Sequence, residues 1–214
     1  LRKLDAGLEL GRWLKSFEGL PELCTAQSLF GRPAPLEIEL GSGKGLFLAS
    51  AAAANPDTDY LGLEVARKYA EFAAARLAKR QLANACVAHG DGLRVFRERV
   101  PDGSLAAVHV YFPDPWWKAR HRKRRVMNSA FLADVQRTLQ PGGRLHFWTD
   151  VEEYFHSALE LIAAATSLAG PLQVPEDQPA HDLDYRTHFE RRMRQNGLPV
   201  YRAAFMQPGG PVDG

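Results

Sequence analysis

The chain has 214 residues, of which 45% are hydrophobic and 24% are charged, and its formal net charge at pH 7 is +2. This composition is typical of an ordinary globular domain, and no apolar run reaches the ~20 residues that a membrane-spanning helix needs, so we expect no membrane association. The two cysteines, Cys24 and Cys86, lack metal-ligand spacing, so we expect free thiols, no metal site and a cytoplasmic location.

Residues 1–35 are predicted to form a helical extension followed by a Pro-rich connector at 31–35. The apolar residues that suggest the helix are Leu8, Leu10, Trp13, Leu14 and Phe17. The role of this extension stays open.

From residue 36 onward, predicted strands alternate with predicted helices. Strands are expected at 36–40, 59–64, 85–88, 105–112, 144–149 and 200–206, and helices at 45–54, 67–82, 128–139, 152–165 and 185–196. This alternation predicts an α/β fold with a doubly wound, mostly parallel sheet and helices on both faces. We expect residues 36–206 to form a single domain and 207–214 to form a disordered tail.

The first strand of this domain ends in a glycine-rich turn, Glu39–Gly45, with glycines at positions 41, 43 and 45. Gly41 and Gly43 would let the backbone approach a ligand closely. A dinucleotide site would need glycine where Leu46 stands, and Glu39 would repel phosphate but suit an ammonium group. The turn therefore favours S-adenosylmethionine, although a tight turn without a ligand is the simpler alternative.

Carboxylates also follow the next predicted strands: Glu64, Asp91 and Asp114. Glu64 could accept hydrogen bonds from ribose hydroxyls, and Asp91 from an adenine amino group. Any one of these acids could instead cap a helix or form a turn, and Asp91-Gly92 in particular could be only a turn. Acids at four successive strand ends, counting Glu39, are harder to explain by capping.

A dense basic run follows the Pro-Asp-Pro turn that carries Trp116 and Trp117. Six positive charges occupy eight residues: Lys118, Arg120, Arg122, Lys123, Arg124 and Arg125. Without them the chain would have 21 basic and 25 acidic residues, a net charge of −4, so the partner of this run should be a polyanion that contacts one place. A solvated face is the alternative. The two tryptophans could stack on an unpaired base or pack in the core.

These motifs together resemble the bacterial tRNA (guanine-N7-)-methyltransferase family, which methylates a guanine in the tRNA variable loop. The resemblance covers residues 36–206. It is carried by the turn Glu39–Gly45, by Phe112-Pro113-Asp114-Pro115-Trp116, by the basic run, by Thr149-Asp150, by Thr187-x-Phe189-Glu190 and by Gly197-x-Pro199-x-Tyr201-Arg202. Trp117 departs from the family, which often has Pro or His at this position.

The resemblance implies a seven-stranded, Rossmann-like class I methyltransferase fold and S-adenosylmethionine as cofactor. It implies a cofactor site made of Glu39, Gly41, Gly43, Glu64, Asp91 and Asp114. It implies guanine or tRNA contacts at Lys118, Asp150, Thr187, His188, Phe189 and Glu190. RNA contacts are expected from Arg120, His121, Arg122, Lys123, Arg124 and Arg125. The partner would be tRNA, bound by a monomer or homodimer without an obligate protein partner.

Guanine N7 carries a free lone pair and no proton, so its methylation needs no general base. Positioning and electrostatics would then supply the catalysis, with Asp114 as the catalytic candidate. Asp114 could orient guanine, stabilise the charge that grows on its ring, or only form the turn. The alternatives are a methyltransferase that acts on another RNA or on a base amino group, and a non-catalytic RNA-binding protein. A nicotinamide oxidoreductase fits least well.

Overall fold

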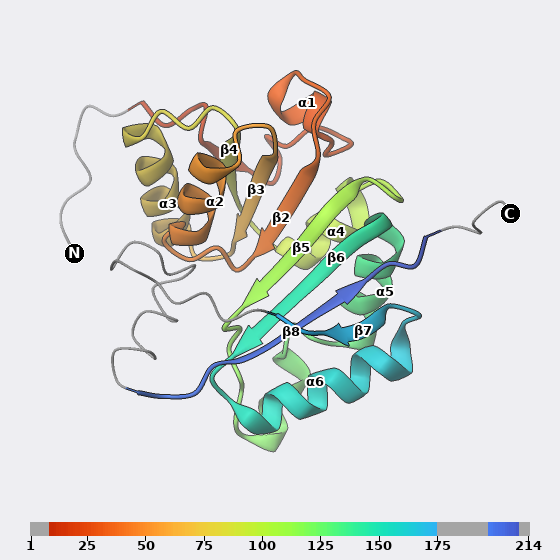
Figure 1. Cartoon of the computed structure of the whole chain (residues 1–214). Helices are drawn as coiled ribbons and strands as arrows, with labels where there is room; N and C mark the ends of the chain where they lie inside the picture. Colours follow the sequence, from red (N-terminus) through yellow and green to blue (C-terminus); the bar gives the residue numbers. More distant parts are fainter. Residues whose placement is uncertain (1–8, 175–196, 210–214) are drawn as a thin grey trace, which may run out of the picture.

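The computed structural model describes residues 9–174 and 197–209 of the chain. In these residues an eight-stranded sheet is covered by helices on both faces (Figure 1). The strands are β1 (Leu14–Ser16), β2 (Leu36–Leu40), β3 (Asp59–Glu64), β4 (Ala85–His89), β5 (Leu105–Tyr111), β6 (Leu139–Thr149), β7 (Ala169–Leu172) and β8 (Tyr201–Met206). The helices are α1 (Ala26–Phe30), α2 (Leu46–Ala54), α3 (Arg67–Lys79), α4 (Gly92–Arg99), α5 (Ser129–Thr138) and α6 (Glu152–Ala165), with a 3-10 helix at Ala119–Arg124.

The sheet order is β1-β4-β3-β2-β5-β6-β8-β7, and β8 runs antiparallel to both of its neighbours. The pairs from β1 to β6 are parallel. The predicted doubly wound α/β fold is confirmed, with eight strands in the described residues in place of seven. The predicted strands and the helices near 45–54, 67–82, 128–139 and 152–165 are present with shifts at their ends, the largest at β6, which begins at Leu139 and not at 144. The elements α1, α4, β1 and β7 were not predicted.

The alternating sequence of β2 explains why one sheet face carries polar groups. Leu36 and Ile38 are buried in the larger apolar core, which α4, α5 and α6 cover. Glu37 and Glu39 point to the other face, where α2 and α3 pack over the smaller core. The carboxylate at the end of β2 is therefore delivered to the α2 side of the sheet.

The helix predicted over 8–17 is wrong in the part that the structure describes. Leu14–Ser16 instead form β1, which pairs in parallel with Val87–His89 of β4. Trp13 fixes this strand because its Nε1 donates a 2.8 Å hydrogen bond to the Leu82 carbonyl. The apolar spacing resembled a helical stripe. However, the edge of β4 would otherwise present unpaired backbone groups, and pairing with this edge favours an extended conformation for residues 14–16.

Two predicted segments lie partly or wholly outside the described residues: the helix at 185–196 and most of the tail at 207–214. In the described residues, no helix has both the length and the apolar character that crossing a membrane requires. Cys24 and Cys86 are free and buried, and burial raises the pKa of their thiols to about 11 and about 12, respectively.

The glycine turn predicts a specific stability difference. Gly45 has φ +65°, and a Cβ added there would lie 2.7 Å from Cβ of Ala73 on α3. We expect Gly45→Ala to lower the free energy of unfolding by about 1–2 kcal/mol for the left-handed backbone and by about 1–3 kcal/mol more for the contact with α3. Urea unfolding of the purified variant measures the change.

The matched control is Gly103→Ala, where φ is +58° but no atom lies within 4 Å of the added Cβ. It should show only the backbone cost. Equal losses in the two variants would contradict the argument that α2 and α3 need a residue without a side chain at position 45.

Candidate active site

A cavity of about 630 Å³ opens at the carboxyl ends of β2, β3 and β5. β2 and β5 are neighbours, and the chain leaves them toward opposite faces of the sheet, which is where doubly wound folds bind ligands. The cavity is lined by all six residues predicted for the cofactor: Glu39, Gly41, Gly43, Glu64, Asp91 and Asp114. Their individual roles stay predictions.

The glycine turn forms one wall of the cavity. Gly41, Gly43 and Gly45 have φ values of 79°, 53° and 65°, which residues with a side chain rarely adopt. The resulting path returns the backbone toward β3 and places Gly45 at the start of α2. Glycine at these alternate positions is therefore required by the shape of the turn itself.

Glu64 holds this turn against the end of β3. Its Oε2 accepts a 2.7 Å hydrogen bond from the Gly43 N–H, and its Oε1 accepts a 2.8 Å bond from the Ala66 N–H. The side chain is buried and lines the cavity. Glu64 thus has a structural role, and its remaining lone pairs face the space where a ligand would lie.

Glu39 is buried beside it, and its Oε2 has no hydrogen-bond partner in the described part of the chain. Burial raises the pKa of Glu39 well above its usual value, and the negative charge of Glu64 raises it further. A buried carboxyl oxygen without a partner is costly, so this site is suited to a cationic group in the cavity.

Asp91 is a helix cap and also lies at the cavity. Its Oδ1 accepts hydrogen bonds of 3.0 Å from the Leu93 N–H and 3.4 Å from the Arg94 N–H, so it is the N-cap of α4. The same side chain is exposed and lines the cavity. The capping interpretation is therefore confirmed without removing Asp91 from the site.

Asp114 lies on the opposite wall, in the turn Phe112–Trp116 (the 112–116 turn). Phe112 and Trp116 have φ values of 49° and 44°, a left-handed conformation that is unusual for large side chains. Trp116 is half-buried and lines the cavity, whereas the side chain of Trp117 is 65% exposed and does not pack in the core. Strained backbone thus brackets the carboxylate.

The basic run starts before the 3-10 helix and continues through it. Lys118, Arg120, Lys123 and Arg124 are exposed, and the Arg124 guanidinium lies 5.0 Å from the centre of the Trp116 ring at the cavity. His121 is partly buried, and its Nε2 accepts a 3.2 Å hydrogen bond from Arg120. The side chain of Arg122 lies outside the described part of the structure.

Arg125 does not belong to the exposed run, which corrects its predicted contact with RNA. It is buried, and its guanidinium hydrogen-bonds to the Pro115 carbonyl and to Glu153. A side chain committed to these partners has no free fork for a phosphate.

Two other predicted substrate residues, Lys118 and Asp150, lie in the described part of the chain. Lys118 is exposed and Asp150 partly buried, and neither lines the cavity. Asp150 is not the N-cap of α6, because Val151 occupies the N-cap position. The Val151 N–H donates a hydrogen bond to Thr149 Oγ1. Thr187, His188, Phe189 and Glu190 lie outside the described residues.

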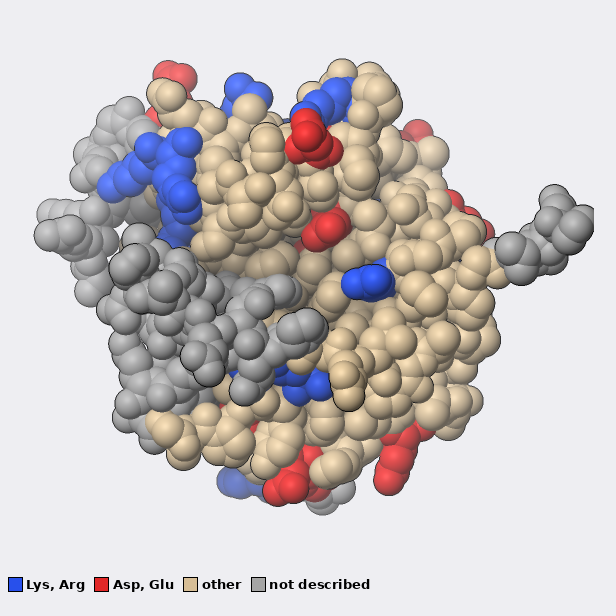
Figure 2. All heavy atoms as spheres, viewed as in Figure 1, with Lys and Arg blue, Asp and Glu red and all other residues tan. Residues whose placement is uncertain are grey.

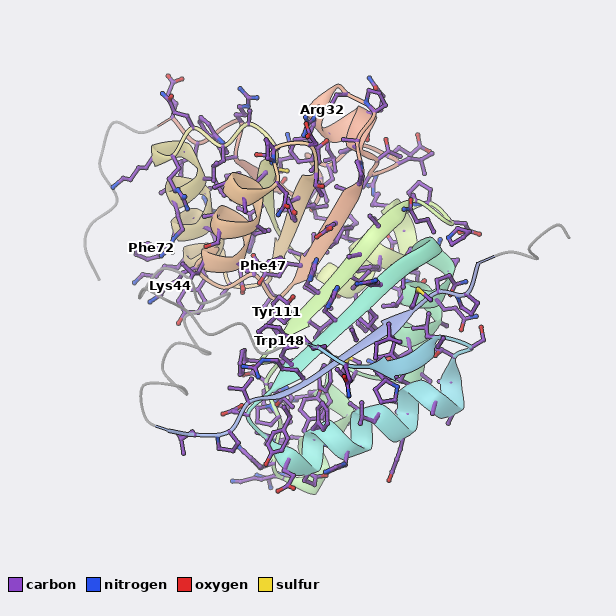
Figure 3. All side chains as sticks on the ribbon, viewed as in Figure 1. Arg32, Lys44, Phe47, Phe72, Tyr111 and Trp148 are labelled. Carbon is purple, nitrogen blue, oxygen red and sulfur yellow. The ribbon has the colours of Figure 1, made fainter. Side chains whose placement is uncertain are left out.

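Aromatic residues that the sequence analysis missed pack beside the cavity, and two of them, Phe47 and Tyr111, line it. Figure 3 shows Phe47, Tyr111 and Trp148 close together, where α2 meets the ends of β5 and β6, and ring centroids are 5.0 Å apart for Phe47–Tyr111 and 4.8 Å for Tyr111–Trp148. The Tyr111 hydroxyl lies 2.8 Å from Nδ1 of His109, whose Nε2 lies 2.8 Å from a Glu37 oxygen. The period-2 alternation of β5 was the available signal, since it puts His109 and Tyr111 on the same face as Glu39.

A second concentration of positive charge was also missed. Residues 67–80, which include α3, carry five basic residues and one acid. In the face shown in Figure 2, Lys and Arg side chains gather over the region where Figure 1 places α3. Positive charge therefore lies on both sides of the cavity, since Lys44 and Arg124 line it from opposite walls.

Comparisons with known proteins agree with this arrangement. The family described as "Putative methyltransferase" matches residues 33–203. A Rhodopirellula baltica protein named tRNA (guanine-N(7)-)-methyltransferase is 53% identical over 96% of this chain and 78% of its own length. A protein of the same name from Alcanivorax borkumensis is 41% identical over 84% of this chain and 75% of its own length.

Solved structures share the fold at low identity. A SAM-dependent methyltransferase from Aquifex aeolicus superposes with a TM-score of 0.56 at 12% identity, covering 81% of this chain and 82% of that protein. A structure described as an antibiotic-related methyltransferase gives a TM-score of 0.59 at 15% identity, covering 83% and 90%. These likenesses support the fold.

The buried state of Glu39 predicts a pH-dependent stability. The carboxyl group has a pKa near 4.5 in the unfolded chain and a raised pKa in the native state. Between these two pKa values, the native state keeps a proton that the unfolded chain has lost. The stability of the wild type therefore falls as the pH rises from the lower pKa to the higher one. We expect Glu39→Gln to be more stable than the wild type by a margin that grows with pH, by up to about 1.4 kcal/mol per unit. Urea unfolding at pH 5, 6, 7 and 8 measures this margin.

Glu64→Gln is the matched control, because Glu64 already accepts two backbone N–H bonds. An amide keeps only one acceptor oxygen, so this variant should lose about 1–3 kcal/mol. A margin for Glu39→Gln that stays constant from pH 5 to pH 8 would contradict the burial argument.

Proposed function

The chain belongs to the tRNA (guanine-N7)-methyltransferase family, and from this premise we propose that it methylates N7 of a guanine in the variable loop of tRNA. The methyl donor is S-adenosylmethionine. One cavity carries the proposal. In it converge a buried carboxyl oxygen that has no partner among the described residues, three further acids and an arginine from the basic run.

The residues present fit the donor. The free Oε2 of Glu39 suits the ammonium group of the methionine part, and the acids Glu64 and Asp91 suit the ribose hydroxyls and the adenine amino group. A cavity of about 630 Å³ is within the range typical of cofactor sites. When bound, S-adenosylmethionine supplies an electrophilic methyl group on a sulfonium centre.

Asp114 is the candidate for orienting guanine. Methylation moves positive charge onto the purine ring, and a fixed carboxylate near the ring favours that shift. The same carboxylate could accept hydrogen bonds from the N1–H and N2–H edge, which adenine lacks. Since N7 has no proton to lose, the residues at this wall need only position the base and complement its charge.

The half-buried Trp116 gives the extruded base a surface on which to stack, with the Arg124 guanidinium beside its ring. The exposed cations Lys118, Arg120 and Lys123 would contact phosphates near the cavity. Asp150 and residues 187–190 complete the proposed guanine and tRNA contacts on family resemblance.

Labelled methyl transfer tests this function. The protein is incubated with methyl-labelled S-adenosylmethionine and unmodified tRNA, and the tRNA is then treated with borohydride and aniline, which cleave the chain at N7-methylguanine. Label with cleavage in the variable loop is the expected result. Label without cleavage would reject N7, and cleavage elsewhere would reject the variable loop.

Asp114→Asn should separate binding from catalysis. We expect kcat to fall about 100-fold, because the amide removes the charge while keeping the shape of the side chain. Isothermal titration with S-adenosylhomocysteine checks the predicted cofactor contact of the same carboxylate, and a change in Kd much smaller than the fall in kcat assigns the main effect to the chemical step. Near-wild-type kcat would show that Asp114 only shapes the turn.

The basic run predicts a salt dependence of tRNA binding. In Arg120→Ala/Lys123→Ala, the slope of log K against log salt should become shallower by roughly one unit for each phosphate that is no longer neutralised. Filter binding across a salt series measures the slope. The matched control is Arg97→Ala on α4, where the side chain is 66% exposed, and this variant should keep the wild-type slope. If the double variant also keeps the wild-type slope, the tRNA binds another surface.

A further inference from the structure

Arg125 ends the basic run, yet its side chain turns inward and contacts α6. We propose that Arg125 is a positioning residue that holds the 112–116 turn against α6 and so sets Asp114 and Trp116 at the cavity. The catalytic consequence of this proposal rests on the proposed function. The bridge that Arg125 forms between the 112–116 turn and α6, called the clamp below, is argued from the contacts alone.

The guanidinium of Arg125 joins two distant segments. Its Nε donates a 2.8 Å hydrogen bond to the Pro115 carbonyl in the turn. Its Nη2 donates a 2.9 Å bond to Glu153, and its Nη1 lies 3.3 Å from the Ser157 hydroxyl, both on α6. The side chain is 9% exposed, and the guanidinium lies 4.5 Å from the centre of the Tyr154 ring. One planar group thus bridges the turn and the helix.

The turn needs such an anchor for reasons of backbone chemistry. Pro113 and Pro115 have no N–H groups, so this stretch has few donors with which to hydrogen-bond to its surroundings. Phe112 and Trp116 are held at positive φ, a conformation that persists only when surrounding contacts enforce it. A carbonyl fixed by a buried guanidinium supplies that enforcement one residue from Asp114.

The chain after Arg125 is fixed to the same helix. The Met127 N–H lies 3.3 Å from the Tyr154 hydroxyl, and Met127 is buried. Because Arg124 and Arg125 are neighbours, docking Arg125 on α6 directs Arg124 toward the cavity, where its guanidinium lies over Trp116. The clamp therefore orients both the carboxylate turn and the arginine that faces it.

Lysine could not replace this arginine. Its ammonium is a compact charge without a planar fork, so it cannot reach Pro115 and two groups of α6 together while stacking on Tyr154. Arg125→Lys keeps the charge and removes the bridge, which makes it the informative variant. Ser157→Ala, which deletes a weaker contact of the same guanidinium, should show a smaller effect in the same direction.

The kinetic test separates positioning from RNA contact. For Arg125→Lys we expect kcat to fall about 10- to 100-fold, with an unchanged Kd for S-adenosylhomocysteine and an unchanged salt slope of tRNA binding. In an Asp114→Asn background, Arg125→Lys should cause a much smaller further loss than it causes in the wild type, because most of its effect acts through that carboxylate. A reduced salt slope with wild-type kcat would make Arg125 a phosphate contact and overturn the proposal, as would full additivity with Asp114→Asn.

Hydrogen–deuterium exchange tests the clamp without any substrate. The peptide that spans residues 112–117 should exchange faster in Arg125→Lys, and to a lesser degree in Ser157→Ala, while peptides of β2 and β3 stay unchanged. Unaltered exchange in both variants would overturn the clamp. If the wild type fails to methylate tRNA, the proposed function fails, whereas this exchange measurement still decides the role of Arg125.

Discussion

The double hydrogen bond to Glu64 is the interaction on which the cavity depends. By accepting from Gly43 and Ala66, one carboxylate joins the glycine turn to the end of β3 and fixes where α2 begins. It also places a fixed negative charge beside Glu39, which keeps that buried acid from ionising easily. Removing Glu64 would therefore disturb the turn, the start of the helix and the protonation of its neighbour together.

The two walls of the cavity are rigid for different reasons. The Glu39–Gly45 wall is set by local backbone chemistry, since its glycines adopt conformations that few other residues tolerate. The Phe112–Trp116 wall places large side chains in a similar conformation and so relies on distant contacts with α6. Under the proposed function, binding the donor and positioning the acceptor base would draw on separate parts of the fold, and substitutions on α6 would affect the second without the first.

The sequence predicted much of the sheet and the cofactor wall, because period-2 alternation and acids at strand ends are local signals. It failed for the N-terminal segment, whose short strand β1 is decided by the free edge of β4, not by its own pattern. The sequence also could not show that Arg124 is exposed and Arg125 buried, because neighbouring residues of the same charge have no periodic pattern that distinguishes them. The difference arises only because Arg125 docks on α6. Asp91 shows that two interpretations need not compete, since the residue caps α4 and its contact with the cofactor stays a prediction.

The partnerless oxygen of Glu39 has a consequence for the charge balance of the site. At pH values between the ordinary and the raised pKa of Glu39, this acid keeps its proton in the free protein, whereas an ammonium group in the cavity would favour its ionised form. Filling the site would then exchange the proton for the ammonium charge. The net charge of this carboxyl group and its ammonium partner is then the same as that of the protonated acid, although the donor also brings its sulfonium and carboxylate charges. An RNA that approaches the surrounding cations would meet nearly the same potential from this group in the free and the loaded protein, so the order of binding would not be dictated by Glu39.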